Sequence, residues 1–264
     1  MRVLAIVQAR MGSSRLPGKV LLEAVDKPLI VLMLERVRRA RRLDDICLAT
    51  SRGASDDVLA SVVAEAGFRV FRGSEDDVLE RFHAAASNTP AEVVVRLTGD
   101  CPLHDPAIID QVVEAFLGSV PSCSYASNVF PPSYPDGLDV EVFSREALAC
   151  SARTSTHPLA REHVTFDIHR QHGDAELRPQ ILNVSAPADF SHLRWTLDHL
   201  EDYALIKEIF TTLYPLNRAF SWLDVVALLT RRPELLSLNA RHLRNASYMA
   251  SLDSANSAGS RSGG

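Results

Sequence analysis

Short apolar runs alternate with amphipathic segments along the first hundred residues of the chain. The apolar runs predict buried strands at Met1–Gln8, Ile46–Thr50, Phe68–Phe71 and Glu92–Leu97. The segments between them carry apolar residues at helical spacing and predict helices at Pro28–Ala40, from Asp57 to Ala66, and from Asp76 to Ser87. Strands that alternate with helices at this spacing predict βαβ units and a mostly parallel sheet.

Polar residues and a glycine mark the ends of these helices. Ser55, Asp56 and Asp57 can cap the second helix, and Gly67 can end it. Ser74 can cap the third helix in the same way. These residues therefore predict where each helix begins and ends.

The second half of the chain is less regular. Its pattern predicts helices at Pro106–Leu117, Arg145–Ala152, Leu159–His169, Glu201–Leu213 and Trp222–Leu229, and strands at Leu138–Phe143, Ile181–Val184 and Leu193–Leu197. The prolines of the segment Val120–Asp139 predict that it is rich in loops. We expect one domain over residues 1–245 and a disordered Ser/Gly-rich tail over residues 246–264, because the tail has too little apolar content to fold.

Composition and charge narrow the class of protein. Hydrophobic residues make up 46% and charged residues 23%, as in ordinary globular proteins. No apolar run approaches the roughly 20 residues that a membrane span needs, and no export signal is visible, so we expect a cytoplasmic protein without a membrane partner. The four cysteines lack CxxC spacing and are expected to stay reduced. The net charge of −5 argues against a nucleic-acid partner.

The segment Gln8–Lys19 follows the first strand and is the first candidate for chemistry. It carries three cations and no acid, and its small residues allow backbone N–H groups to approach an anion. It is not a Walker A loop, because five residues separate Gly12 from Gly18 and Val20 replaces the hydroxyl residue. A phosphate site and a solvated basic loop both remain open on composition alone.

A second candidate follows the fourth strand, where Asp100 would face the basic loop across the same edge of the sheet. Ligands bind beyond the carboxyl ends of strands in open α/β sheets, and a carboxylate there could hold Mg²⁺. A turn-forming or helix-capping role for Asp100 is the alternative. Asp198, which closes the predicted strand Leu193–Leu197, is a second carboxylate candidate, whereas Glu201 and Asp202 suit the first turn of a helix.

Six segments, in order along the chain, resemble the cytidylyltransferases related to spore coat polysaccharide biosynthesis protein F. These cytidylyltransferases are similar in turn to the synthetases that make CMP-activated acidic sugars such as Kdo and sialic acid. The segments are Gln8–Lys19, Arg72–Val78, Arg96–Pro102, Asp136–Glu141, Arg161–Thr165 and Trp195–Asp202. The resemblance implies a nucleotide-diphospho-sugar transferase fold, which is a Rossmann-like, GT-A-type three-layer α/β sandwich with a mostly parallel mixed sheet. It also implies a nucleotidyltransferase that moves CMP from CTP to a small anionic acceptor with release of pyrophosphate, and a homodimer.

The resemblance also implies roles for individual residues. CTP would be bound by Ala9, Arg10, Gly12, Ser13, Arg15, Lys19, Gly73, Ser74 and Thr98. Arg10, Lys19 and Asp100 would act in catalysis, and Asp100 and Asp198 would hold Mg²⁺. The acceptor would be bound by Asp139, Glu141, Arg161 and His163. A structural ion pairing with Glu162 is the alternative for Arg161 and His163.

Two other functions stay open at this stage. A glycosyltransferase of similar sheet architecture typically shows an Asp-x-Asp motif, which Asp100-Cys101-Pro102 does not supply. A catalytically silent nucleotide-binding scaffold would have no need for the combination of Arg10, Lys19 and two aspartates. We therefore expect an enzyme.

Overall fold

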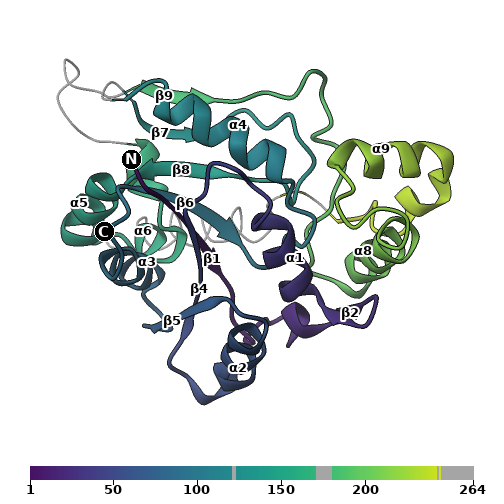
Figure 1. Ribbon diagram of the computed structural model, residues 1–264, viewed down its shortest axis with the longest axis horizontal. Helices are drawn as coiled ribbons and strands as arrows, with labels where there is room; N and C mark the ends of the chain where they lie inside the picture. The colour runs from purple at the N-terminus through teal and green to yellow at the C-terminus, as the bar shows by residue number, and fades with distance from the viewer. Residues whose placement is uncertain (121–122, 171–179, 243, 245–264) are drawn as a thin grey trace, which may run out of the picture.

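A seven-stranded sheet runs through the protein (Figure 1), and the candidate site lies beyond the carboxyl ends of its central strands. The computed structural model describes residues 1–120, 123–170, 180–242 and 244, so the expected tail at residues 246–264 lies outside the described residues. The strands lie in the order β5-β4-β1-β6-β8-β7-β9. Their bounds are β1 Val3–Gln8, β4 Asp45–Ser51, β5 Arg69–Gly73, β6 Val93–Thr98, β7 Cys123–Ser127, β8 Glu141–Ser144 and β9 Gln180–Asn183.

The sheet is mostly parallel, as predicted. Only β8, among the described strands of this sheet, runs antiparallel to its neighbours β6 and β7. A separate small hairpin pairs β2, Glu23–Ala24, with β3, Lys27–Pro28. The four predicted strands of the first half of the chain correspond to β1, β4, β5 and β6. A mixed α/β sheet of the expected class is therefore present.

Helices cover both faces of the sheet. They are α1 Leu29–Val37, α2 Asp57–Glu65, α3 Val78–Ser87, α4 Pro106–Leu117, α5 Arg145–Thr154, α6 Pro158–His163, α7 Phe166–Arg170, α8 Leu200–Leu213 and α9 Trp222–Arg231. Short 3₁₀ turns span Lys19–Leu21, Ala54–Asp56 and Pro233–Ser237. No described helix combines the length and the apolar character that a membrane span requires.

The two cores follow from the alternation of side chains along β1. Val3, Ala5 and Val7 pack in one core with α1, α2, α4, α8 and α9. Leu4 and Ile6 pack in the other core with α3 and α5. Figure 1 shows α3, α5 and α6 gathered on one side of the sheet. Because β1 is buried on both faces, its apolar run is continuous rather than alternating.

Two predicted helix caps are wrong in detail. Asp56 lies at the N-cap position of α2, but its carboxylate accepts hydrogen bonds from Met11 N (2.7 Å), Thr50 Oγ1 (2.8 Å) and Ser51 N (3.0 Å) instead of capping the helix. The third helix begins at Val78, and its cap is Asp77, which accepts from Glu80 N at 2.9 Å. Ser74 Oγ instead accepts from Asp77 N, one turn earlier. Asp77 therefore caps α3 in place of the predicted Ser74, and the Asp56 carboxylate holds the loop after β1 instead of capping α2.

Three predicted elements of the second half differ from the structure. The segment Val120–Asp139 contains β7 and is not only loop. The single helix predicted at Leu159–His169 is two helices, because the backbone at Val164 takes a positive φ of 53° between α6 and α7. The strand predicted at Leu193–Leu197 is an extended buried segment that forms one isolated bridge, between Arg194 and Asp136. Its apolar side chains are buried, but its backbone crosses the end of the sheet rather than joining the ladder.

This crossing segment is held close to the backbone at Gly137. Trp195 N donates to Asp136 O at 2.7 Å, and Leu197 N donates to Asp100 O at 2.8 Å. Gly137 has φ +103°, and a Cβ atom there would lie 2.7 Å from the carbonyl carbon of Trp195. Only glycine fits both the conformation and the space, so Gly137 allows the two segments to meet.

We predict that Gly137→Ala destabilises the fold more than Gly67→Ala. Gly67 also has a positive φ, of +80°, but a Cβ atom there would meet nothing within 4 Å. Gly67→Ala should therefore cost only the backbone penalty of about 1–2 kcal/mol. Gly137→Ala should cost about 1–3 kcal/mol more, because the new methyl group overlaps backbone atoms. Urea denaturation of both variants measures this difference, and equal losses of unfolding free energy would contradict it.

Candidate active site

A cavity of about 570 Å³ opens where β1 and β6 end. Its lining comes from β1 and the loop after it, the first turn of α3, β6 and the segment after it, residues 129–141, residues 162–169 and the crossing segment. The predicted site residues that line it are Ala9, Arg10, Gly12, Ser13, Arg15, Lys19, Thr98, Asp100, Asp139, Glu141, His163 and Asp198. Residues of widely separated segments are thus brought together, as the strand-edge argument predicts.

The loop after β1 is held by its backbone. Gly99 N donates to Gln8 O at 2.8 Å, and a Cβ atom on Gly99 would lie 2.6 Å from Ala9 Cβ. Farther along, Gly18 N donates to Met11 O at 3.0 Å, and Gly18 has a left-handed φ of +70°. Together with the hydrogen bond from Met11 N to Asp56, these contacts fix the loop over the end of the sheet.

Lys19 joins the two predicted metal ligands. Its Nζ atom lies 2.8 Å from Asp100 Oδ2 and 2.9 Å from Asp198 Oδ1, and the lysine is buried. Burial alone would lower the pKa of Lys19, but the two carboxylates raise it above its usual value. Burial would raise the pKa of Asp100 and Asp198, but Lys19 lowers both. All three groups are therefore charged at neutral pH.

Two arginines complete the contacts of Asp198. Arg15 Nη2 lies 2.6 Å from Asp198 Oδ1, and Arg194 Nη2 lies 3.0 Å from Asp198 Oδ2. Arg10 is exposed at the cavity, and the described part of the chain forms no ion pair with it. The mouth of the cavity at this end is thus rich in cations, which suits a polyanion such as a triphosphate.

Arg194 is a site residue that the sequence reasoning missed. Its buried guanidinium pairs with Asp136 (3.0 Å), Asp198 (3.0 Å) and Asp202 (3.1 Å). Asp202 also accepts from the backbone N–H groups of Asp198 and His199, both at 2.9 Å, so it caps α8 as expected and holds Asp198 in place. The only available signal was the presence of Asp136 and Arg194 in or beside two of the recognised segments.

Glu141 also lines the cavity, and all of its contacts are made within the protein. It pairs with Arg96, and it accepts from the hydroxyls of Tyr125 (2.7 Å) and Thr165 (2.6 Å). Burial would raise the pKa of Glu141, but Arg96 and these hydroxyls lower it. Arg96 in turn donates from Nε to Gln8 Oε1 at 3.0 Å. Glu141 is therefore ionised, and it orients Arg96 at the cavity wall.

Three predicted site residues lie outside the described lining of the cavity: Gly73, Ser74 and Arg161. Arg161 forms an ion pair with Asp77 and donates to Ala152 O at 2.8 Å, so its partner is not Glu162. His163 does line the cavity, and its Nε2 atom lies 3.9 Å from Glu162. The carbonyl oxygen of Ser74 accepts a hydrogen bond from Arg81, which does line the cavity.

The carboxylates of Asp100 and Asp198 fit a magnesium ion. Both carboxylates contact the Lys19 ammonium, so their oxygens lie close enough together to bind one cation. Mg²⁺ requires hard oxygen ligands, and it is commonly held by one or two carboxylates with water and phosphate oxygens completing the shell. The donor set and the cationic loop beside it match these requirements.

Comparison with known proteins places this site in a family. The cytidylyltransferase family matches residues 4–214. Spore coat polysaccharide biosynthesis protein SpsF of Bacillus subtilis is 35% identical over 237 residues, which cover 88% of this chain and 95% of SpsF. A solved cytidylyltransferase from Leptospira borgpetersenii superposes with a TM-score of 0.83 at 31% identity, covering 89% of this chain and 97% of the other.

A more distant solved structure shares the fold. It is a CMP:2-keto-3-deoxy-manno-octonic acid synthetase in complex with CTP, with a TM-score of 0.60 at 17% identity, covering 80% of this chain and 98% of that one. Its likeness supports the Rossmann-like nucleotidyltransferase architecture that the sheet order shows. On the match over residues 4–214 and the identity to SpsF, the chain belongs to the cytidylyltransferase family.

Proposed function

We propose that this protein transfers CMP from CTP to a small anionic acceptor and releases pyrophosphate. The observation that carries the proposal is the convergence of Lys19, Asp100 and Asp198 at one point beside the cationic loop. These groups come from three distant parts of the sequence, and all line one cavity. A scaffold without activity has no need to bury and pair these charges.

The residues of the loop would bind and orient the triphosphate. Arg10, Arg15 and Lys19 would neutralise its charge, and the backbone N–H groups of Gly12 and Ser13 would donate to its oxygens. Mg²⁺ bound by Asp100 and Asp198 would supply further neutralisation of the charge. Phosphoryl-type transfer needs little covalent help from the protein, so positioning and charge neutralisation provide most of the rate.

The acceptor would bind at the opposite end of the cavity. In the proposed reaction its oxygen attacks the α-phosphorus of CTP, a new P–O bond forms, and the bond to pyrophosphate breaks. Arg96 and His163 line this end and can face an acidic group, and Asp139 and Glu141 can accept from hydroxyls. Sugar acids, phosphosugars and phosphonates share the required negative charge.

The proposed setting follows from the substrates. CTP is a cytoplasmic metabolite, and the four cysteines of this chain are unpaired, as expected in a reducing compartment. The similarity to SpsF favours a role in polysaccharide biosynthesis. A homodimer through the segment Val120–Asp139 is part of the proposal, and light scattering after size-exclusion chromatography tests it.

A pyrophosphate-release screen tests the reaction. The purified protein is incubated with Mg²⁺, each of the four nucleoside triphosphates, and a panel of sugar acids, phosphosugars and phosphonates. We expect release with CTP and only with one acidic acceptor class. Release of a nucleoside diphosphate from a nucleotide sugar would instead indicate a glycosyltransferase.

We predict that Lys19→Ala and Asp100→Ala each lower turnover by about 10²–10³-fold, since Lys19 would contact the reacting phosphates directly and Asp100 would hold the Mg²⁺ that neutralises them. Lys207→Ala removes an exposed lysine on α8 and serves as the matched control. Circular dichroism establishes that each variant is folded. Turnover of a folded Lys19→Ala variant at the level of the Lys207→Ala control would contradict the assignment.

We predict a pH-dependent stability difference for Asp139→Asn. Burial raises the pKa of Asp139 to about 7, although Arg244 at 2.6 Å opposes this shift. The folded chain therefore retains a proton that the unfolded chain, with a pKa near 3.8, releases between about pH 4 and pH 7. The unfolding free energy of the wild type therefore falls as the pH rises from about 4 to 7. The unfolding free energy of Asp139→Asn should rise relative to it by a few kcal/mol over the same range.

Urea unfolding of both proteins across this pH range measures the difference. Asp76→Asn, which removes an exposed carboxylate, controls for the loss of a negative charge. A difference between Asp139→Asn and the wild type that does not change with pH would show that Asp139 is already ionised at pH 4.

A further inference from the structure

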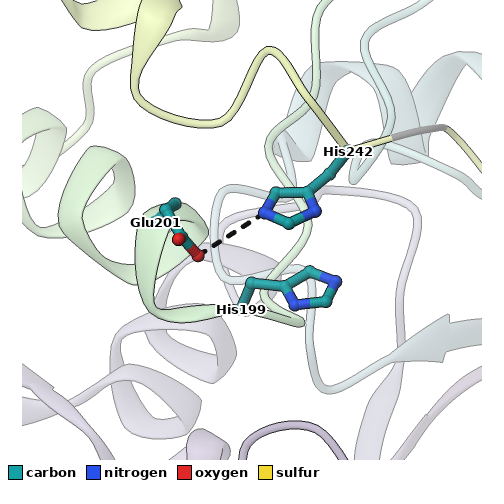
Figure 2. A group of neighbouring side chains, drawn as sticks. All are labelled: His199, Glu201 and His242. Atoms are coloured by element: carbon teal, nitrogen blue, oxygen red, sulfur yellow. Dashed lines mark ion pairs between the residues drawn. The ribbon is translucent and has the colours of Figure 1, made fainter.

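Two histidines and a glutamate meet where the C-terminal segment passes the start of α8 (Figure 2). His199 directly precedes α8, and Glu201 lies in its first turn. His242 comes from the segment after the 3₁₀ turn Pro233–Ser237. One potential ligand atom of each residue lies within 4.8 Å of the other two. None of the three belongs to the described lining of the cavity, so this group is distinct from the pair of Asp100 and Asp198.

The spacing of the three side chains is close to that of zinc ligands. His242 Nε2 lies 3.4 Å from Glu201 Oε2. Ligand atoms bound to Zn²⁺ at its usual bond lengths, in a tetrahedron, are about 3.4 Å apart, so this pair already has the required separation. The rings of His199 and His242 are stacked, with centroids 3.8 Å apart and planes 3° apart, as Figure 2 shows beside the carboxylate of Glu201. Because the nitrogen lone pair of an imidazole lies in the plane of its ring, the His199 side chain must rotate out of this stack for both histidines to reach one ion.

Contacts of neighbouring residues fix both segments that carry the group. Buried Asn239 donates to Arg194 O at 3.0 Å and to Asp202 Oδ1 at 2.8 Å, which anchors the C-terminal segment beside α8. Arg241 pairs with Glu201 through Oε1, leaving Oε2 directed at His242, and it donates from Nε to His242 Nε2 at 3.4 Å, a hydrogen bond that the ion would replace. Such contacts orient metal-binding side chains and reduce the entropy lost on binding.

We propose that His199, Glu201 and His242 form a site for a divalent transition-metal ion of the zinc class. Two imidazoles and one carboxylate form a typical three-residue zinc set, with water as the fourth ligand. Hard ions such as Mg²⁺ prefer oxygen ligands and are poor occupants of this site. The ion connects the C-terminal segment to α8, and this segment also supplies Arg244, the partner of Asp139 in the cavity. This inference does not depend on the proposed reaction.

Competition of the untagged, metal-stripped full chain with a chromophoric chelator for Zn²⁺, in excess Mg²⁺, tests the site. We expect one zinc equivalent per chain. His199→Ala and His242→Ala should each weaken binding by at least about 100-fold, since removing even an outer-shell partner commonly costs 10–100-fold. His192→Ala removes an exposed histidine outside the group and should bind as the wild type does. Asp100→Asn should also keep its affinity, because Asp100 belongs to the other site.

Thermal unfolding with and without Zn²⁺ provides a second measurement. Zinc should raise the Tm of the wild type and of His192→Ala, and not that of His242→Ala, because a ligand that binds only the folded state stabilises it. If an alanine variant does not fold, His242→Gln and Glu201→Gln, which keep similar size, decide the result. The absence of zinc binding by the wild type, or equal affinity in folded His199 and His242 variants, overturns the proposal.

Discussion

The buried guanidinium of Arg194 constrains the whole candidate site. A desolvated cation is costly unless it is paired and hydrogen-bonded, so the fold must bring carboxylates to it. Asp136, Asp198 and Asp202 meet this requirement from two distant segments. Three carboxylates carry more negative charge than one arginine can neutralise. Lys19 and Arg15 supply the additional positive charge at Asp198. The position of the loop after β1 is therefore coupled electrostatically to the crossing segment at the other end of the sequence.

Charge pairing at this range also requires backbones that approach closely. Gly137 allows the chain around Asp136 to contact the carbonyl of Trp195, and Gly99 allows the end of β6 to contact Ala9. A side chain at either position would push apart the segments that carry the charges. The glycines thus allow the backbones to approach, and the ion pairs determine which segments meet. Both are needed to form the site.

Sequence reasoning succeeded where the signal was local or followed from strand order. The parallel first half was predictable because each apolar run is short and bounded, and Lys19 and Asp100 were predictable as neighbours because β1 and β6 end at one edge. The segment Leu193–Leu197 was misread as a strand, since burial produces the same apolar run whether or not the backbone joins a ladder. The partner of Arg161 is Asp77, on a distant helix, and no local pattern indicates such a pair. The roles of Arg194 and Asp136 were missed for the same reason.

The two proposed binding regions of the cavity, around the loop Gln8–Lys19 and around Arg96, differ in how their charges are balanced, and this difference bears on the proposed acceptor. In the loop Gln8–Lys19, Arg10 has no ion-pair partner in the described part of the chain, so it can bind a triphosphate without releasing a protein carboxylate, whereas Arg15 and Lys19 are shared with Asp198. In the other region Arg96 is already paired with Glu141. The proposed acidic acceptor would therefore compete with the carboxylate of Glu141 for Arg96, which would favour ligands whose geometry recovers that loss. The partner of Asp139, Arg244, lies in the C-terminal segment. A change in that segment would therefore alter the charge balance around Asp139 without altering the loop Gln8–Lys19.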